Sequence, residues 1–107
     1  MEFLFAHAGL TPPDAKSLDR NTVRQLVQRG VLVEVDGVAF HISALETARL
    51  NVVEILITNP NGFTVSQFRE HLGITRKHAV PLLEALDSRG VTKRSGDLRV
   101  GGARLDR

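Results

Sequence analysis

The 107-residue sequence has no cysteine, no tryptophan and no tyrosine, and only five phenylalanines and one methionine. Without cysteine the chain has no disulfide, no thiolate nucleophile and no cysteine-based zinc or iron–sulfur site. It also lacks any apolar run near the roughly 18 residues of a membrane span, and residues 1–10 lack the basic start and cleavage site of a signal peptide. We therefore expect a protein of the reducing cytoplasm, held together by packing alone.

Length and composition describe a small folded protein. With 42% hydrophobic residues, 24% charged residues and a net charge of +2, the chain is too apolar and too nearly neutral for a disordered segment. At this length it forms one ordinary domain or two very small ones, which leaves no room for a large catalytic core.

The charge is distributed unevenly along the chain. Residues 1–60 carry a net charge of −2, whereas residues 61–107 carry +4. A basic half favours a polyanionic partner, although a solvated surface accounts for a surplus of this size equally well.

An internal repeat is the most informative pattern in the sequence. Residues 23–31 and 83–91 are offset by sixty positions, and both end in the same Arg-Gly-Val triplet. Gly30 and Gly90 suit the left-handed position that ends a helix. Each copy then continues into a strand, a tight turn and a second strand, with Asp36 and Gly37 as the first turn and residues 95–97 as the second.

The segment between the two copies predicts a helix-turn-helix. A capping box at residues 43–46 opens a helix over residues 44–58, and a second capping box at residues 64–67 opens a short helix that Gly73 ends. Thr75 can cap a third helix over residues 76–88, in which Pro81 predicts a kink or a loosened first turn. Followed by the second β-hairpin, these elements describe a helix-turn-helix with a wing.

The first copy is shorter than the second. Residues 1–8 and 19–29 predict its first and last helices, with Asp19 or Asn21 as the cap of the latter, while a segment rich in Gly and Pro leaves the middle helix reduced or missing. The fold class is therefore mainly α with small β-hairpin wings, built as two tandem winged-helix domains of which the first is reduced. We place the first at residues 1–43, with a structural or orienting role, and the second at residues 44–107.

Apolar residues at helical spacing are expected to form the core rather than a site. On the wing, strand alternation places Val91, Leu98 and Val100 against the body and lets the basic residues project. The expected helical core residues are Leu4, Leu26, Leu50, Val53, Ile57, Phe68, Leu83 and Leu86.

Residues 64–100 resemble the last winged-helix domain of bacterial selenocysteine-specific translation elongation factors (SelB). The resemblance is carried by Thr-Arg-Lys-His-Ala at residues 75–79, by Pro-Leu-Leu-Glu at residues 81–84 and by Arg-Gly-Val-Thr-Lys-Arg-x-Gly-Asp at residues 89–97. Gly-Leu-Thr-Pro-Pro at residues 9–13 resembles the start of the preceding winged-helix domain in that family, so the resemblance covers nearly the whole chain. The sequence departs from the family in its curtailed first unit and in having no GxxxxGK[ST] phosphate loop.

The resemblance implies an RNA-binding C-terminal fragment of such a factor, recognising the mRNA hairpin that recodes UGA for selenocysteine. It also implies the GTPase part of the factor and the ribosome as partners in the full-length context. For this chain it implies a monomer with no cofactor and no enzymatic activity.

The candidate RNA contacts are basic residues of the second unit. A helix start offers free amides and a positive dipole end to a phosphate, although a solvated helix start is the simpler alternative. Cations on the wing form a second phosphate clamp, or they protect an exposed strand edge. The candidates are Arg76, Lys77 and His78 at the start of the third helix, Lys93, Arg94 and Arg99 on the wing, and Arg69 and His71 on the exposed side of the second helix.

Other charged residues carry less weight. Arg89, like Arg29 in the first copy, is expected to neutralise a helix C-terminus. Arg104 and Arg107 are expected in a frayed tail after two glycines. The histidines, His7, His41, His71 and His78, have no metal-type spacing, so neither catalysis nor metal binding is supported.

Three function classes remain open. An RNA-binding module with so few aromatic residues cannot build a stacking sheet, so it would recognise the looped bases of a hairpin. A DNA-binding winged-helix regulator is disfavoured, because the exposed face of the third helix carries Glu84, Asp87 and Ser88. A protein-interaction winged helix suits the acidic first unit.

Overall fold

The computed structural model describes residues 9–12 and 19–106. The helix expected over residues 1–8, with Leu4 and His7, most of the segment up to residue 17, and Arg107 lie outside the described residues. No helix in the described part of the chain is long and apolar enough to cross a membrane. In chain order the elements are α2 (Arg20–Gln28), β1 (Leu32–Val35), β2 (Val38–His41), α3 (Ile42–Thr58), α4 (Val65–Leu72), α5 (Arg76–Ser88), β3 (Thr92–Ser95) and β4 (Leu98–Gly101).

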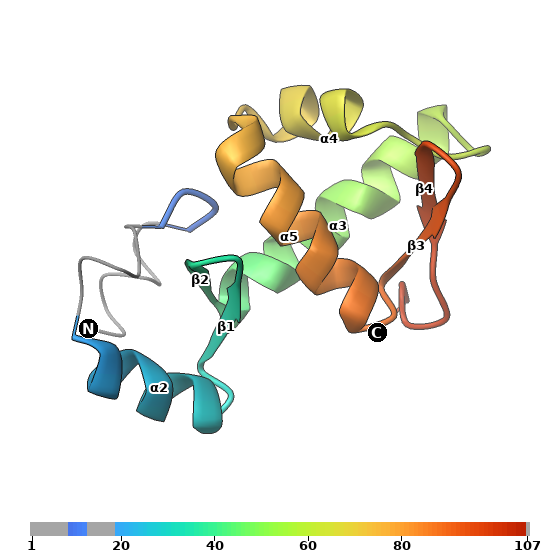
Figure 1. The fold of residues 1–107 in the computed structure, drawn as a ribbon. Coiled ribbons are helices and arrows are strands. Elements are labelled where there is room, and N and C mark those ends of the chain that lie inside the picture. Colours follow the sequence, from blue (N-terminus) through green and yellow to red (C-terminus); the bar gives the residue numbers. More distant parts are fainter. Residues whose placement is uncertain (1–8, 13–18, 107) are drawn as a thin grey trace.

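The second unit has the helix-turn-helix and wing that the sequence predicts (Figure 1). Helices α3, α4 and α5 pack against one another, and the antiparallel pair β3–β4 lies against α3 and α5. Phe63 and Phe68, with ring centroids 5.9 Å apart, stack in the middle of this core. The predicted winged-helix class, mainly helical with small antiparallel hairpins, is confirmed.

Both copies of the repeat end their helix in the same way. The N–H of Gly30 donates to the carbonyl of Val27 and the N–H of Val31 donates to the carbonyl of Leu26, each at 3.0 Å. The same two bonds recur around Gly90, and both glycines have the predicted positive φ, at 76° and 78°. This pair of bonds satisfies the last helical carbonyls and turns the chain into the following strand.

The start of α3 differs from the prediction. The N-cap is His41, whose ring accepts a hydrogen bond from the N–H of Ser43 at 3.1 Å. Glu46 binds Arg49 instead of a backbone amide, so the capping box expected at residues 43–46 is wrong. The reason is that β2 leads directly into the helix, which therefore begins at Ile42. At the other predicted ends, Asp19 rather than Asn21 caps α2, and the capping box of α4 is present.

The buried face of α3 also differs from the prediction. Leu50 and Ile57 are 52% and 75% exposed, so their expected place in the core is wrong. Both faces of this helix are apolar, so spacing alone could not choose between them. The buried face consists of Ala44, Leu45, Ala48, Val52 and Ile55.

The first β-hairpin contacts both α2 and the core of the second unit. Its two faces alternate, so Leu32 and Ala39 pack with Val23 of α2, whereas Phe40, opposite Val33, enters the core of the second unit. The Arg20 guanidinium binds the Glu34 carboxylate at 2.7 Å and holds α2 to β1. The division into residues 1–43 and 44–107 stays a prediction, and the core that contains Phe40 extends across that boundary.

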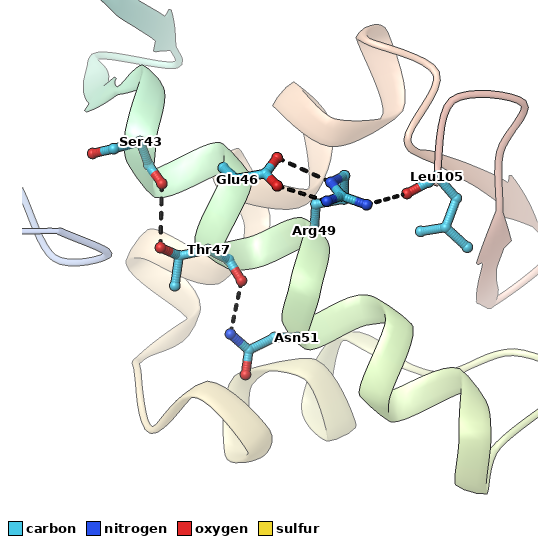
Figure 2. A network of polar contacts seen from close by, with 6 residues as sticks. All are labelled: Ser43, Glu46, Thr47, Arg49, Asn51 and Leu105. Carbon is cyan, nitrogen blue, oxygen red and sulfur yellow. Dashed lines mark hydrogen bonds and ion pairs between the residues drawn. The ribbon is translucent and has the colours of Figure 1, made fainter. Parts of the chain in front are cut away.

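The C-terminal tail folds back on the second unit. The N–H of Gly102 donates to the carbonyl of Val91 at 2.9 Å, and the N–H of Arg104 donates to the carbonyl of Gly90 at 2.8 Å. Arg49 also donates to the carbonyl of Leu105 (Figure 2). The frayed tail expected over these residues is therefore wrong, since hydrogen bonds to two distant segments hold it.

Candidate nucleic-acid interface

The start of α5 presents free backbone donors and two cations. Its N-cap, Thr75, makes no side-chain cap bond. The N–H groups of Arg76 and Lys77 have no acceptor among the described residues, and both side chains are exposed and form no ion pair there. Because the positive end of a helix dipole adds to these charges, this terminus can hold a phosphate oxygen.

His78 is more enclosed than its two neighbours. Burial, together with the nearby Lys77 charge, lowers its pKa below the usual 6.5, and a hydrogen bond to the backbone of Pro12 acts in the opposite direction. The imidazole is therefore neutral near pH 7. In this state one ring N–H is directed at the Pro12 carbonyl, so His78 can accept a hydrogen bond from a ligand but offers it no charge.

The wing carries its exposed cations near the turn. Lys93 and Arg94 on β3 are exposed, and Arg94 Nε makes only a long, 3.3 Å hydrogen bond to the carbonyl of Gly96. The turn lies at the end of the β-hairpin farthest from the end of α5, because β3 begins directly after that helix end. Phe63 pairs with Arg99 on the open edge of β4, with N···O distances of 3.0 Å and 2.8 Å, and so adds a third strand of one residue to the wing sheet.

Arg99 does not project from the wing. It is only 8% exposed, and its Nε and Nη2 donate to Asp87 Oδ2 at 3.3 Å and 3.0 Å. The hydroxyl of the buried Thr92 donates to Oδ1 of the same carboxylate. The expectation that Arg99 points into solvent is therefore wrong, because the β-strand face that carries it turns toward α5. Arg99 positions the wing.

The two candidates on α4 already have acidic neighbours. Arg69 lies 3.7 Å from a carboxylate oxygen of Glu70, and His71 Nε2 lies 3.1 Å from Glu54 Oε2 of α3. These contacts reduce the positive field that either side chain offers to a phosphate. Arg76, Lys77, Lys93 and Arg94 are therefore the better-exposed cations of the candidate set.

The acidic residues of α5 are more enclosed than the sequence suggested. Asp87 is occupied by Arg99 and Thr92, so its expected exposure is wrong. Glu84 is half-buried, and its pKa is raised by a hydrogen bond to Asp36 in the first β-hairpin turn, then by burial. No sequence pattern marked Asp87 and Thr92 as the anchor of the wing, because the interaction depends on how the wing packs. Among the described residues, no group of three or more acidic or histidine side chains could hold a metal.

Comparison with known proteins finds similar proteins for the second unit. Residues 54–100 match the family model described as "Elongation factor SelB, winged helix". The chain is 30% identical over 109 aligned residues to the selenocysteine-specific elongation factor of Desulfomicrobium baculatum, an alignment that covers 92% of the chain but 17% of that protein. The chain thus spans less than a fifth of this relative's length.

Two solved structures are similar to the chain. One is the mRNA-binding domain of elongation factor SelB from E. coli in complex with SECIS RNA, with a TM-score of 0.66, 27% identity, and coverage of 78% of this chain and 69% of that one. The other is a bacterial selenocysteine-specific elongation factor, EF-Sec, with a TM-score of 0.67, 25% identity, and coverage of 80% of this chain and 14% of that one. The resemblance noted from the sequence is confirmed.

Proposed function

We propose, from the premise that residues 54–100 are a winged-helix domain of the SelB type, that this chain binds an mRNA hairpin of the selenocysteine-insertion type. The observation that carries the proposal is the uncapped start of α5, where free amides and exposed cations come together in a domain similar to one solved with SECIS RNA. In this proposal residues 44–107 hold the RNA and residues 1–43 orient them.

The contacts divide into two groups. Arg76 and Lys77 at the helix start and Lys93 and Arg94 on the wing anchor phosphates, since all four side chains are exposed. His78, neutral and half-enclosed, is the best placed of the candidates to hydrogen-bond an unstacked base. Arg69 and His71 act as secondary contacts from α4.

A looped RNA fits this arrangement better than a duplex. The major groove of A-form RNA is too deep and narrow for a recognition helix, and the second half of α5 presents the half-buried carboxyl group of Glu84 rather than cations. The helix start and the wing need only touch the backbone on either side of a loop. The loop bases then supply the sequence preference.

The wider role follows from the relatives. In a full-length factor the chain would recruit a GTPase part and its tRNA to the ribosome in the cytoplasm, and the chain itself would act as a monomeric binding module rather than as an enzyme. A GTPase phosphate loop is absent from this sequence, which suits that division of labour.

Competition binding tests the proposal. A labelled selenocysteine-insertion hairpin is bound to the full chain at near-physiological salt, then challenged with unlabelled hairpin, with the same stem closed into a continuous RNA duplex, and with duplex DNA of equal charge. We expect only the intact hairpin to compete efficiently. Equal competition by duplex DNA would favour a DNA-binding regulator, and no binding of any nucleic acid would favour a protein-interaction module.

A matched pair of variants assigns the binding surface. Lys77→Ala should weaken hairpin binding, whereas Arg24→Ala, which removes an exposed cation of α2, should leave it unchanged. Equal losses in both variants would mean that total charge, not the helix start, determines binding.

A further inference from the structure

A cationic hollow lies at the end of α5 opposite the candidate hairpin contacts. It has a volume of about 620 Å³ and is lined by Ser88, Arg89, Val91 and Arg104, none of them acidic. A smaller hollow of about 180 Å³ shares Arg89 and Val91 and extends to Arg49. We call the larger one the α5 C-terminal hollow.

The folded tail builds one wall of this hollow. The N–H of Arg104 donates to the carbonyl of Gly90 at 2.8 Å, and the tail carbonyl of Leu105 accepts a hydrogen bond from Arg49 at 2.7 Å (Figure 2). Arg49 is itself held by both carboxylate oxygens of Glu46. Arg104 is thereby placed beside Arg89 before any ligand arrives.

Gly102 makes this placement possible. A Cβ atom at this position would lie 2.2 Å from the carbonyl oxygen of Gly90, so no other residue fits without moving the tail. The Cγ and Cδ atoms of Arg104 lie 3.5 Å and 3.6 Å from where a Cβ of Gly90 would be, which puts the stem of that arginine directly over the helix end. The two glycines therefore allow close backbone contact rather than a loose end.

The guanidinium groups of the two arginines make no hydrogen bond to the helix end. The carbonyls of Ala85, Leu86 and Asp87 already accept hydrogen bonds from the N–H groups of the following turn. The side chains of Arg89 and Arg104 are exposed and make no hydrogen bond or ion pair with any described residue. Their guanidinium donors are therefore available to a ligand, and planar forks of this kind suit phosphate oxygens.

We propose that the α5 C-terminal hollow binds the phosphate backbone of a second RNA segment while a stem-loop occupies the start of α5 and the wing. The choice of RNA as partner rests on the proposed function, and the anion preference rests on the two free guanidinium groups. The 13 residues of α5 separate its two ends by roughly 20 Å, so a compact stem-loop on one end leaves the other open. The carboxylates at this end of α5 already have cationic neighbours: Glu46, which lines the smaller hollow, is paired with Arg49, Asp87 is paired with Arg99, and Asp106 of the tail lies close enough to act on Arg49.

The experiment measures two RNAs on one chain. The full chain is first saturated with one equivalent of an unlabelled selenocysteine-insertion hairpin, so that no excess stem competes for the second site, and binding of a fluorescent RNA duplex of unrelated sequence is then followed by anisotropy. We expect the duplex to bind the saturated chain. The double variant Arg89→Ala with Arg104→Ala should weaken duplex binding at least about tenfold, and it should change hairpin affinity by less than about twofold.

Two further variants separate placement from charge. Arg29→Ala removes the arginine at the equivalent helix end of the first copy, which is also exposed, and should leave duplex binding unchanged. Gly102→Ala keeps every charge but displaces the tail, so it should weaken duplex binding in the native background and have no further effect when Arg104 is already alanine. Thermal unfolding of each variant confirms that the chain remains folded under the assay conditions.

The outcomes are distinct. Duplex binding that is abolished by the hairpin, that is unchanged in the double variant, or that falls equally in Arg29→Ala overturns the inference. Failure of the hairpin to bind the native chain refutes the proposed function instead, and arginine-dependent duplex binding in that case still supports an RNA-backbone site at this end of α5.

Discussion

The carboxylate of Asp87 and the guanidinium of Arg99 form an ion pair that fastens the wing to α5, with Nη2 3.0 Å from Oδ2. The Arg99 side chain is 10% exposed and that of Asp87 is 25% exposed, so water screens the pair only partly. Thr92 completes the anchor from the neighbouring strand. The position of the exposed wing cations therefore depends on an arginine that itself faces inward.

Arg99→Ala should destabilise the chain rather than simply remove an RNA contact. Loss of the guanidinium leaves Asp87 without its charged partner. A hydrogen bond to a charged group contributes about 1.5–3 kcal/mol to stability. We expect a fall of that order, about 2 kcal/mol, in the free energy of unfolding measured by urea denaturation. Lys93→Ala on the exposed face should change it by no more than about 0.5 kcal/mol, and equal stability of the two variants would contradict the anchor.

Lys93→Ala should instead change the salt dependence of hairpin binding. Each phosphate contact that is lost lowers the slope of log affinity against log salt by roughly 0.7–0.9. The effect should be the same for hairpins of different loop sequence, because a phosphate contact carries no sequence information. An unchanged slope in both Lys93→Ala and Arg94→Ala would assign these cations to protection of the strand edge.

Hairpin binding should strengthen as the pH falls toward the lowered pKa of His78, below which the gain is complete. Protonation there adds a positive charge beside Lys77, and bound phosphates favour the charged form. Stability changes in the opposite direction: because the unfolded chain binds this proton more readily, the free energy of unfolding declines as the pH drops from about 6.5 through the lowered value. Hairpin affinity measured as a function of pH should lose this dependence in His78→Gln and retain it in His71→Gln.

Glu84→Gln should raise stability at neutral pH. The raised pKa of Glu84 means that the folded chain binds its proton more tightly than the unfolded chain does. That stabilisation is complete below the usual pKa of 4.5 and is lost as the pH rises through the raised pKa, because the ionised Glu84 is repelled by Asp36. The charge of Asp87 adds to this repulsion, and the charge of Arg99 opposes it. Glutamine can donate to Asp36 at every pH, so unfolding curves of the variant should lack this step. Glu70→Gln on the exposed side of α4 serves as the control and should keep this loss of stability with rising pH. A loss of equal size in Glu84→Gln would show that the Asp36–Glu84 pair does not cause it.

Phe40→Ala should destabilise the second unit although the residue belongs to the first β-hairpin. Its side chain is fully buried in the core that α3, α4 and α5 share. Removing a buried phenylalanine costs about 3–5 kcal/mol, which chemical denaturation followed by circular dichroism would detect. Ile57→Ala, at a site that is 75% exposed, should cost no more than about 0.5 kcal/mol. A small effect of Phe40→Ala would show that the two units fold independently.

Local patterns in the sequence determined where most elements begin and end. Gly30 and Gly90 end their helices because a left-handed residue is needed there, and Thr64 with Gln67 caps α4 because their side chains reach the free amides of that first turn. Such features depend on neighbouring residues alone, so they were predictable. The basic start of α5 belongs to the same class and carries the candidate site, although Thr75, which the sequence offers as its cap, makes no side-chain cap bond.

Packing decided the features that depend on residues far apart in the chain. The apolar residues on both faces of α3 left its buried side undetermined until the β-hairpins and α5 covered one of them, which exposed Leu50 and Ile57. Arg99 turned inward because a carboxylate twelve residues earlier lay on the face against which the wing packs. Spacing along a strand specifies which residues share a face, but only the tertiary structure determines which face meets the body and which meets water.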